Sequence, residues 1–344
     1  MPRHGSLMIV GGGDTPLSVQ KRFVALAGGS GKAKIAIFPM ASRKFDEEAR
    51  EVVNDFESLG ADVFVFTFDR RKANGEALAI ALSEFNGYWF LGGDQSRLAD
   101  ALLGTRALDV IERGFQEGKI VGGTSAGAAV MTTAMLTGRY QERKKNARID
   151  EKKIARKLFE TSQGFGFLEG AIIDQHFLKR ARYNRLLSAV LDQPHLIGVG
   201  IDEETAVLVR PDGKWEVLGE SYVKIFDARH AQVIDGEANR LDSAAEIRLH
   251  LLSEGSEFDP STGHVRLPNA PELIGSNRSP IPPSTSKGFD PAIGPDKPAP
   301  PLNPIPPAQS LAPLPTRSKP EPAPDYDKLK PQTRPEQIQS PEMD

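Results

Sequence analysis

Short apolar runs alternate with amphipathic segments through the first half of this 344-residue chain, and that alternation limits its fold more than any other feature. Each run has four or five residues, rich in β-branched or aromatic types, which predicts strands buried on both faces. The runs are Leu7–Val10, Lys34–Phe38, Val63–Phe66 and Tyr88–Leu91. Segments 46–59 and 75–85 place apolar residues three and four apart, which predicts helices. The alternation predicts an α/β fold with a mostly parallel central sheet flanked by helices.

The second half of the chain changes pattern. Strand-like runs lie closer together there, with turn signals such as Pro211-Asp212-Gly213 between them, which predicts extra antiparallel strands at one side of the sheet. These runs are 197–201, 206–209, 215–217 and 223–226. The charged segment 143–159 is expected to be helical.

Proline marks a second part of the chain, because 21 of its 27 prolines lie at or after Pro268. We therefore expect a globular domain over residues 1–267 and a Pro-rich tail over 268–344. The tail lacks a hydrophobic period and cannot bury enough surface to offset the entropy of ordering, so disordered, partly polyproline-II chain is expected. The alternative is a ligand for a proline-binding groove, since Pro301–Pro304 has PxxP spacing.

Composition excludes several kinds of protein. The net charge of −3 gives no basic excess for binding nucleic acid. Cysteine is absent, which excludes disulfides, thiolate metal sites and cysteine nucleophiles. No segment approaches the roughly 18 to 20 apolar residues of a membrane helix. The first apolar run is too short for a secretory signal and ends in glycine, so a cytoplasmic protein is expected.

A candidate nucleophile lies in the small-residue segment Gly122–Ala128. Residues 123–127 read G-x-S-x-G, after strand-like residues 119–121 and before helix-like residues 128–136, which is the context of a nucleophile elbow. Small neighbours permit a strained turn, and a helix N-terminus supplies N–H groups for an oxyanion. The pattern favours Ser125 as a nucleophile over a helix-capping serine.

A serine nucleophile needs a base and a carboxylate that orients it. Among the six histidines, His176 follows an apolar run and occupies a strand end, although a buried structural histidine fits that position nearly as well. The run 197–201 ends in three acids, Asp202-Glu203-Glu204, whose alternative role is a solvated turn. The order Ser125, His176, Glu203 differs from that of α/β-hydrolases, where the acid precedes the histidine. It argues against an ordinary lipase or esterase.

Four motifs in this order resemble the cyanophycinases, within the Ser-His-Glu peptidases that have a glutamine-amidotransferase-like fold. The motifs are Gly92–Gln95, Gly122–Ala128, Asp174–Phe177 with its following arginines, and Gly200–Glu203. The resemblance covers about residues 5–255. It implies a serine exopeptidase that cuts cyanophycin, a poly-aspartate chain bearing arginine on its β-carboxyls, into β-Asp-Arg dipeptides. It also implies a homodimer that needs no metal or cofactor.

The resemblance assigns roles residue by residue. It makes Ser125 the nucleophile, His176 the general base and Glu203 the orienting acid. The oxyanion hole would be the N–H of Ala126 and an N–H of the Gly93–Asp94 turn, taken as that of Asp94. The substrate-binding residues would be Gln95, Asp174, Gln175, Arg180, Arg182, Arg185, Glu204 and Thr205. The arginines suit a substrate with an aspartyl backbone and a free carboxylate, because a guanidinium pairs with a carboxylate in fork geometry.

The chain departs from the family pattern in two places besides its tail. Glu204 stands where family members often have Asn, which leaves the peptide substrate open, and segment 139–162 has no counterpart in the resemblance. The alternatives are a related aspartyl or isoaspartyl dipeptidase and a catalytically silent scaffold that recruits a partner through its tail. A glutaminase is excluded by the missing cysteine. A dinucleotide-binding enzyme is disfavoured because Gly11-Gly12-Gly13-Asp14 is not G-x-G-x-x-G.

Overall fold

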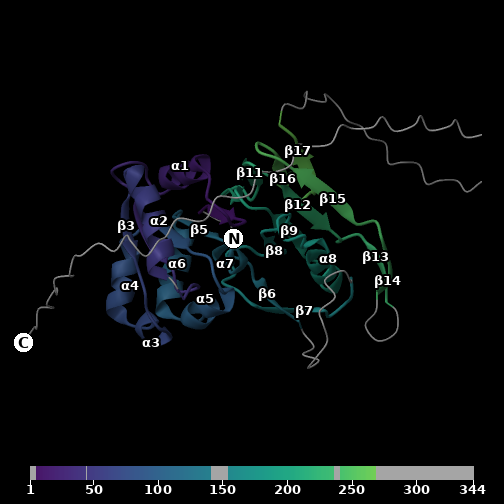
Figure 1. Cartoon of the computed structure of the whole chain (residues 1–344), viewed down its shortest axis with the longest axis horizontal. Coiled ribbons are helices and arrows are strands. Elements are labelled where there is room, and N and C mark those ends of the chain that lie inside the picture. The colour runs from purple at the N-terminus through teal and green to yellow at the C-terminus, as the bar shows by residue number, and fades with distance from the viewer. Residues whose placement is uncertain (1–4, 44, 141–153, 236–240, 269–344) are drawn as a thin grey trace, which may run out of the picture. The chain divides into compact units, whose positions relative to one another are not determined.

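The computed structural model describes residues 5–43, 45–140, 154–235 and 241–268 (Figure 1). The expected Pro-rich tail lies outside the described residues from position 269 onward, so its disorder and the domain boundary at 267/268 stay predictions. Most of the segment 143–159, expected to be helical, also lies outside them; its described part, residues 154–159, is not helical, and a strand begins at Phe159.

The central sheet has nine strands among the described residues, in the order β17-β16-β11-β10-β1-β5-β4-β2-β3. Its parallel strands are β1 (Leu7–Val10), β5 (Ile120–Thr124), β4 (Gly87–Phe90), β2 (Lys34–Phe38) and β3 (Asp62–Val65). Antiparallel strands continue the sheet beyond β1: β10 (Thr205–Val209), β11 (Trp215–Gly219), β16 (Glu257–Asp259) and β17 (His264–Arg266). The predicted α/β fold, with a parallel centre and extra antiparallel strands, is confirmed.

Helices cover both faces of the sheet, which explains the unbroken apolar runs of the fully buried strands β1 and β4. The expectation that residues 63–66 are buried on both faces is wrong, because β3 lies at the edge of the sheet and most of its residues are exposed. Along β1, Leu7 and Ile9 join one buried cluster while Met8 and Val10 join another. The second cluster contains residues of α1 (Leu17–Leu26) and α2 (Phe45–Ser58). The first cluster packs against α4 (Glu76–Ser83), α5 (Gln95–Leu102), α6 (Arg106–Gln116) and α7 (Ala126–Ala129), and α3 (Arg70–Ala73) contributes Ala73 to it.

A second sheet holds β15 (Arg248–Leu252), β12 (Val223–Asp227), β9 (Ile197–Ile201) and β8 (Ala171–Gln175), in that order. It corrects the sequence interpretation, because residues 197–201 and 223–227 do not join the central sheet. The glycines of β9 determine what packs on this strand. A Cβ at Gly198 would lie 2.4 Å from a methyl of Val190 in α8 (Tyr183–Asp192), and one at Gly200 would lie 2.5 Å from the Phe177 ring. One face of β9 is therefore flat, and it accepts a helix and an aromatic ring.

Two hairpins complete the described chain: β6 (Ala134–Tyr140) with β7 (Phe159–Gln163), and β13 (Gln232–Asp235) with β14 (Leu241–Ala245). The helix expected over residues 128–136 is wrong, since α7 ends at Ala129 and β6 begins at Ala134. The carbonyls of Val130 and Met131 accept N–H groups of Phe165 and Leu168 instead of continuing the helix.

Within residues 5–43, 45–140, 154–235 and 241–268, no helix has the length and apolar character required to cross a membrane.

Candidate active site

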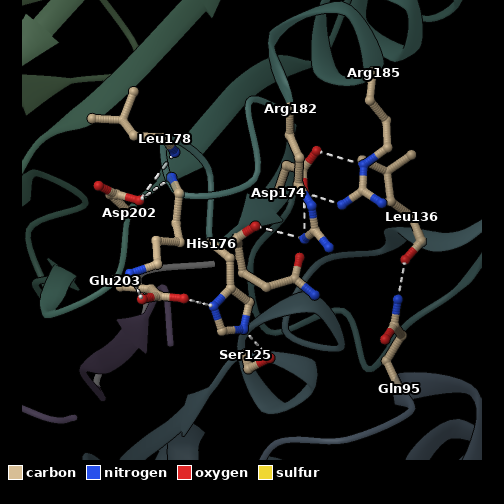
Figure 2. Close-up of polar contacts among 12 residues, drawn as sticks. Gln95, Ser125, Leu136, Asp174, His176, Leu178, Arg182, Arg185, Asp202 and Glu203 are labelled. Carbon is tan, nitrogen blue, oxygen red and sulfur yellow. Dashed lines mark hydrogen bonds and ion pairs between the residues drawn. The ribbon is translucent and has the colours of Figure 1, made fainter. Parts of the chain in front are cut away.

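Three strand ends bring the predicted serine, histidine and acid together (Figure 2). Ser125 follows β5, His176 follows β8 and Glu203 lies just beyond β9. The Ser125 hydroxyl lies 2.8 Å from His176 Nε2, and His176 Nδ1 lies 2.7 Å from Glu203 Oε1. This geometry fits a neutral imidazole that accepts from the serine and donates to the carboxylate.

Ser125 occupies a strained turn. Its backbone angles are φ 53° and ψ −108°, in the left-handed range that L-residues avoid. Small neighbours make this turn possible, because a Cβ at Gly127 would lie 2.1 Å from the Phe90 carbonyl oxygen and one at Gly123 would lie 2.8 Å from it. The Ser125 side chain makes no capping hydrogen bond to α7, which removes the alternative of a helix-capping serine.

His176 is buried beside Ser125, and opposing effects act on the pKa of its imidazole. Burial lowers the pKa of His176 below its ordinary value of 6.5, while the hydrogen bond that its Nδ1 donates to Glu203 raises it. Burial is the larger effect, so the imidazole is neutral at neutral pH and ready to accept a proton.

The end of β1 holds all three loops in register. Successive carbonyls of β1 and the following turn accept N–H groups from the three loops: Val10 from Ser125 at 3.0 Å, Gly11 from His176 at 2.7 Å and Gly12 from Glu204 at 2.9 Å. The glycine run 11–13, which has no dinucleotide-binding spacing, is therefore part of the site as a scaffold. Sequence reasoning missed this role, although the run follows a central strand where sites form.

The turn after β4 lies beside the serine, but it corrects one assignment. The Asp94 N–H donates to the Ala41 carbonyl at 3.0 Å, and the Asp94 carboxylate accepts from Ser96 N–H at 2.9 Å. The Asp94 N–H is thus already engaged and is not a free donor to an oxyanion. Gly92 approaches the nucleophile closely, since a Cβ there would lie 3.4 Å from that of Ser125.

A buried carboxylate gathers two of the predicted arginines (Figure 2). Asp174, with a fully buried side chain, pairs with Arg185 through both carboxylate oxygens and with Arg182 at 3.3 Å. Arg182 also donates to the Gln175 carbonyl at 2.6 Å. Burial, followed by the nearby Arg185, lowers the pKa of Arg182 to about 10. Arg180 is exposed on the same loop, so the cluster holds more positive than negative charge.

The remaining predicted substrate-binding residues differ in their exposure. The Gln95 amide is buried and donates to the Leu136 carbonyl at 2.7 Å, and the Gln175 side chain is also buried. Thr205 is fully buried; its hydroxyl donates to the Glu203 carbonyl and accepts from Ser221 N–H. Asp174 and Thr205 therefore support their neighbours rather than face a substrate. Glu204 is exposed, at φ 57°.

Asp202, which the sequence offered only as one acid of a run, binds the loop after His176. Its Oδ1 accepts N–H groups of Leu178 and Lys179, both at 3.0 Å, and its Oδ2 accepts from the Ser221 hydroxyl at 2.9 Å. No group of three His, Cys, Asp or Glu side chains in the described parts of the chain could hold a metal ion.

A serine hydrogen-bonded to a histidine that is paired with a carboxylate, on a strand–turn–helix of an α/β sheet, is the arrangement of serine hydrolases. The sequence profile of Peptidase family S51 matches residues 7–217, more than half of the chain. The chain belongs to peptidase family S51 and is a serine-type peptidase.

Two curated relatives show how far the similarity extends. The chain is 34% identical over 272 residues to a cyanophycinase of Synechococcus elongatus, which covers 76% of this chain and 81% of that protein. It is 32% identical over 262 residues to a cyanophycinase of Trichormus variabilis, at 74% and 85% coverage. A crystal structure of a peptidase from an acI-B1 actinobacterium has the same fold, with a TM-score of 0.56 at 23% identity, covering 75% of this chain and 98% of that one.

Proposed function

We propose that this peptidase hydrolyses cyanophycin as an exopeptidase and releases β-Asp-Arg dipeptides through Ser125, His176 and Glu203. The observation that carries the proposal is the continuous pair of hydrogen bonds, 2.8 Å from Ser125 to His176 and 2.7 Å from His176 to Glu203. The similarity to proteins named cyanophycinase over three quarters of the chain supports the choice of substrate.

In the proposed reaction, Ser125 Oγ attacks the carbonyl carbon of the scissile peptide bond while its proton passes to His176 Nε2. Glu203 stabilises the resulting imidazolium through Nδ1. The imidazolium then protonates the leaving amine as the C–N bond breaks, which leaves an acyl group on Ser125. A water molecule, deprotonated by His176, attacks that ester and restores the free serine.

The oxyanion of each tetrahedral intermediate needs N–H donors close to Ser125. The N–H of Ala126, directly after the nucleophile, keeps this role in the proposal. Because the Asp94 N–H is engaged by Ala41, we assign the second donor to Gly93, whose φ of 132° is accessible chiefly to glycine.

The arginine cluster accounts for an acidic substrate. Arg182 and Arg185 both pair with the carboxylate of Asp174, and Arg180 adds another positive charge at the surface. Such an excess, partly out of water, favours an anionic group, and we assign it the free carboxylate of the aspartyl chain. Gln95 and Gln175 keep their assigned roles as substrate-binding residues beside these arginines in the proposal, and the exposed Glu204 would meet the arginyl group of the substrate.

One incubation tests the substrate. Purified protein is mixed in parallel with cyanophycin and with arginine-free isoaspartyl dipeptides, and products are identified by mass. Release of β-Asp-Arg from cyanophycin is expected. Cleavage of the dipeptides alone would replace the proposal by an isoaspartyl dipeptidase, the reading that Glu204 leaves open. The homodimer implied by the resemblance stays a prediction, which the mass of the protein in solution tests.

A further inference from the structure

The loop that carries the proposed base depends on a carboxylate outside the triad. His176 has a φ of 49°, so its backbone is held in a conformation that L-residues rarely adopt. The turn that follows is closed by Arg180 N–H to the His176 carbonyl, at 3.0 Å. The N–H groups of Leu178 and Lys179 both donate to Asp202 Oδ1, at 3.0 Å each. This carboxylate oxygen therefore fastens the turn immediately after His176.

Asp202 is itself held from the opposite side. Its second oxygen accepts the Ser221 hydroxyl at 2.9 Å, and its own N–H donates to the Tyr222 carbonyl at 3.3 Å. The Ser221 N–H in turn donates to the Thr205 hydroxyl at 2.9 Å. Asp202 is buried and the hydrogen bonds of its carboxylate are partly buried, so they are partly shielded from water and hold more firmly than fully exposed contacts.

The sequence position of Asp202 gives this arrangement a consequence for the triad. It directly precedes Glu203, whose carboxylate lies 2.7 Å from His176 Nδ1. One side chain thus ties the loop of the base to the loop of the acid. We propose that Asp202 is a positioning residue that fixes the separation of His176 and Glu203, and so acts on catalysis through them. This inference rests on the proposed roles of that pair.

Asp202 forms no hydrogen bond with Ser125 or with the His176 ring among the described residues. Its hydrogen-bonding partners in the described chain are Leu178, Lys179, Ser221 and Tyr222. The charged groups that act on the His176 imidazole are Glu203, Arg180 and Arg182. Substitution of Asp202 leaves all three in the chain, so any change in the behaviour of His176 reports on geometry.

Two substitutions of Asp202 test whether its hydrogen bonds to the loop position His176. Asp202→Ala removes both anchors of the loop. Asp202→Asn keeps Oδ1 as an acceptor for the two N–H groups, and its amide can donate to the Ser221 oxygen. The control is Asp192→Ala, at the far end of α8, where another carboxylate accepts a backbone N–H, that of Lys157 at 2.6 Å.

Two readouts are taken on each full-length protein: kcat and KM on cyanophycin, and the titration of the His176 imidazole by NMR, with its signal assigned from a His176→Gln spectrum. For Asp202→Ala we expect kcat to fall about 10- to 100-fold with KM little changed, as for a catalytic group displaced by about 1 Å. We expect the His176 titration to move to lower pH, because the hydrogen bond to Glu203 that raises the pKa of His176 is weakened. Asp202→Asn should keep kcat within about threefold.

Asp192→Ala should lower the melting temperature but leave kcat and the His176 titration in place. An Asp202→Ala protein that melts earlier yet keeps both kcat and the His176 titration of the wild type would show a structural role only and overturn the proposal. The titration needs no substrate, so a wild-type protein inactive on cyanophycin would refute the proposed function while the titration still decides the role of Asp202.

Discussion

Gly12 lies directly against the imidazole of His176. A Cβ built on Gly12 would stand 2.2 Å from His176 Cε1 and 2.6 Å from Nε2, closer than any non-bonded carbon is found. Its carbonyl meanwhile accepts the Glu204 N–H at 2.9 Å. Gly12 therefore packs against the imidazole of the proposed base and is hydrogen-bonded through its backbone to the loop that carries Glu203.

Gly12→Ala should consequently remove activity by displacing His176. We expect kcat to fall at least about 100-fold, because displacement of a reacting group by about 1 Å has that effect. Gly29→Ala is the matched control, since Gly29 also has a positive φ but its added Cβ would meet nothing within 4 Å. Both variants should lose about 1 kcal/mol or more of stability from backbone strain, measured by urea unfolding. Equal activity in the two would contradict a fixed contact between Gly12 and the base.

The pH dependence of kcat/KM should follow His176. Burial lowers the pKa of His176 in the folded protein, so its neutral, proton-accepting form persists below the ordinary value of 6.5. As pH falls through the lowered pKa, the imidazole is protonated and activity is lost. The acid limb of kcat/KM should therefore lie below pH 6.5, whereas a limb above it would show that burial does not dominate.

Replacement of the acid should move that limb further. Glu203 raises the pKa of His176, first through its hydrogen bond and also through its charge, so Glu203→Gln should shift the acid limb to still lower pH and reduce kcat. Glu204→Gln is the control, because Glu204 is exposed and is not among the groups that act on the His176 pKa. If both variants move the limb alike, Glu203 has no special tie to the imidazole.

Replacement of Asp174 by alanine should lower the free energy of unfolding. Asp174→Ala leaves two largely buried guanidinium groups facing each other without their carboxylate. Removal of one partner from a buried ion pair costs about 3 kcal/mol. Asp212→Ala, which breaks the more exposed pair with Arg210, should cost less than about 1 kcal/mol. Chemical denaturation of both proteins measures the difference, and similar losses would mean that the buried cluster carries no special weight.

Substitution of the exposed Arg180 tests recognition of the substrate carboxylate and leaves the pairs of Asp174 with Arg182 and Arg185 intact. If Arg180 meets the substrate carboxylate, amidation of that terminus should raise KM in the wild type and much less in Arg180→Ala. Arg71→Ala, on the distant helix α3, should behave as the wild type does. The same loss on amidation in all three proteins would exclude contact between Arg180 and the carboxylate.

Short apolar runs identified most of the central sheet, because strands buried on both faces leave no polar period to misread. The pattern at 197–201 predicted a strand but not its sheet, since Gly198 and Gly200 reveal their role only when α8 and Phe177 lie over them. The helix expected over 128–136 failed for a similar reason. Its carbonyls are taken by residues 165–168, which are distant in sequence.

The residues proposed for chemistry were accessible from sequence because each follows a strand-like run, and sites in α/β folds form at strand ends, here those of β5 in the central sheet and of β8 and β9 in the second. The residues that hold them in place could not be predicted from the sequence. Gly12 contacts residues more than 160 positions away in the sequence, and Asp202 joins two separate loops. Runs of glycines and runs of acids also occur in many ordinary turns, so neither run indicated this role. The engagement of the Asp94 N–H by Ala41 likewise depends on the neighbouring strand β2.

The central claim is that Ser125 forms the acyl intermediate, and labelling with a fluorophosphonate tests it most directly. The full-length protein is reacted to completion, digested and mapped by mass spectrometry, while residual hydrolysis of cyanophycin is followed. We expect one adduct, on Ser125, formed in step with loss of activity, and neither adduct nor activity in Ser125→Ala. An adduct on another residue, or hydrolysis by Ser125→Ala at near the wild-type rate, would contradict the assignment.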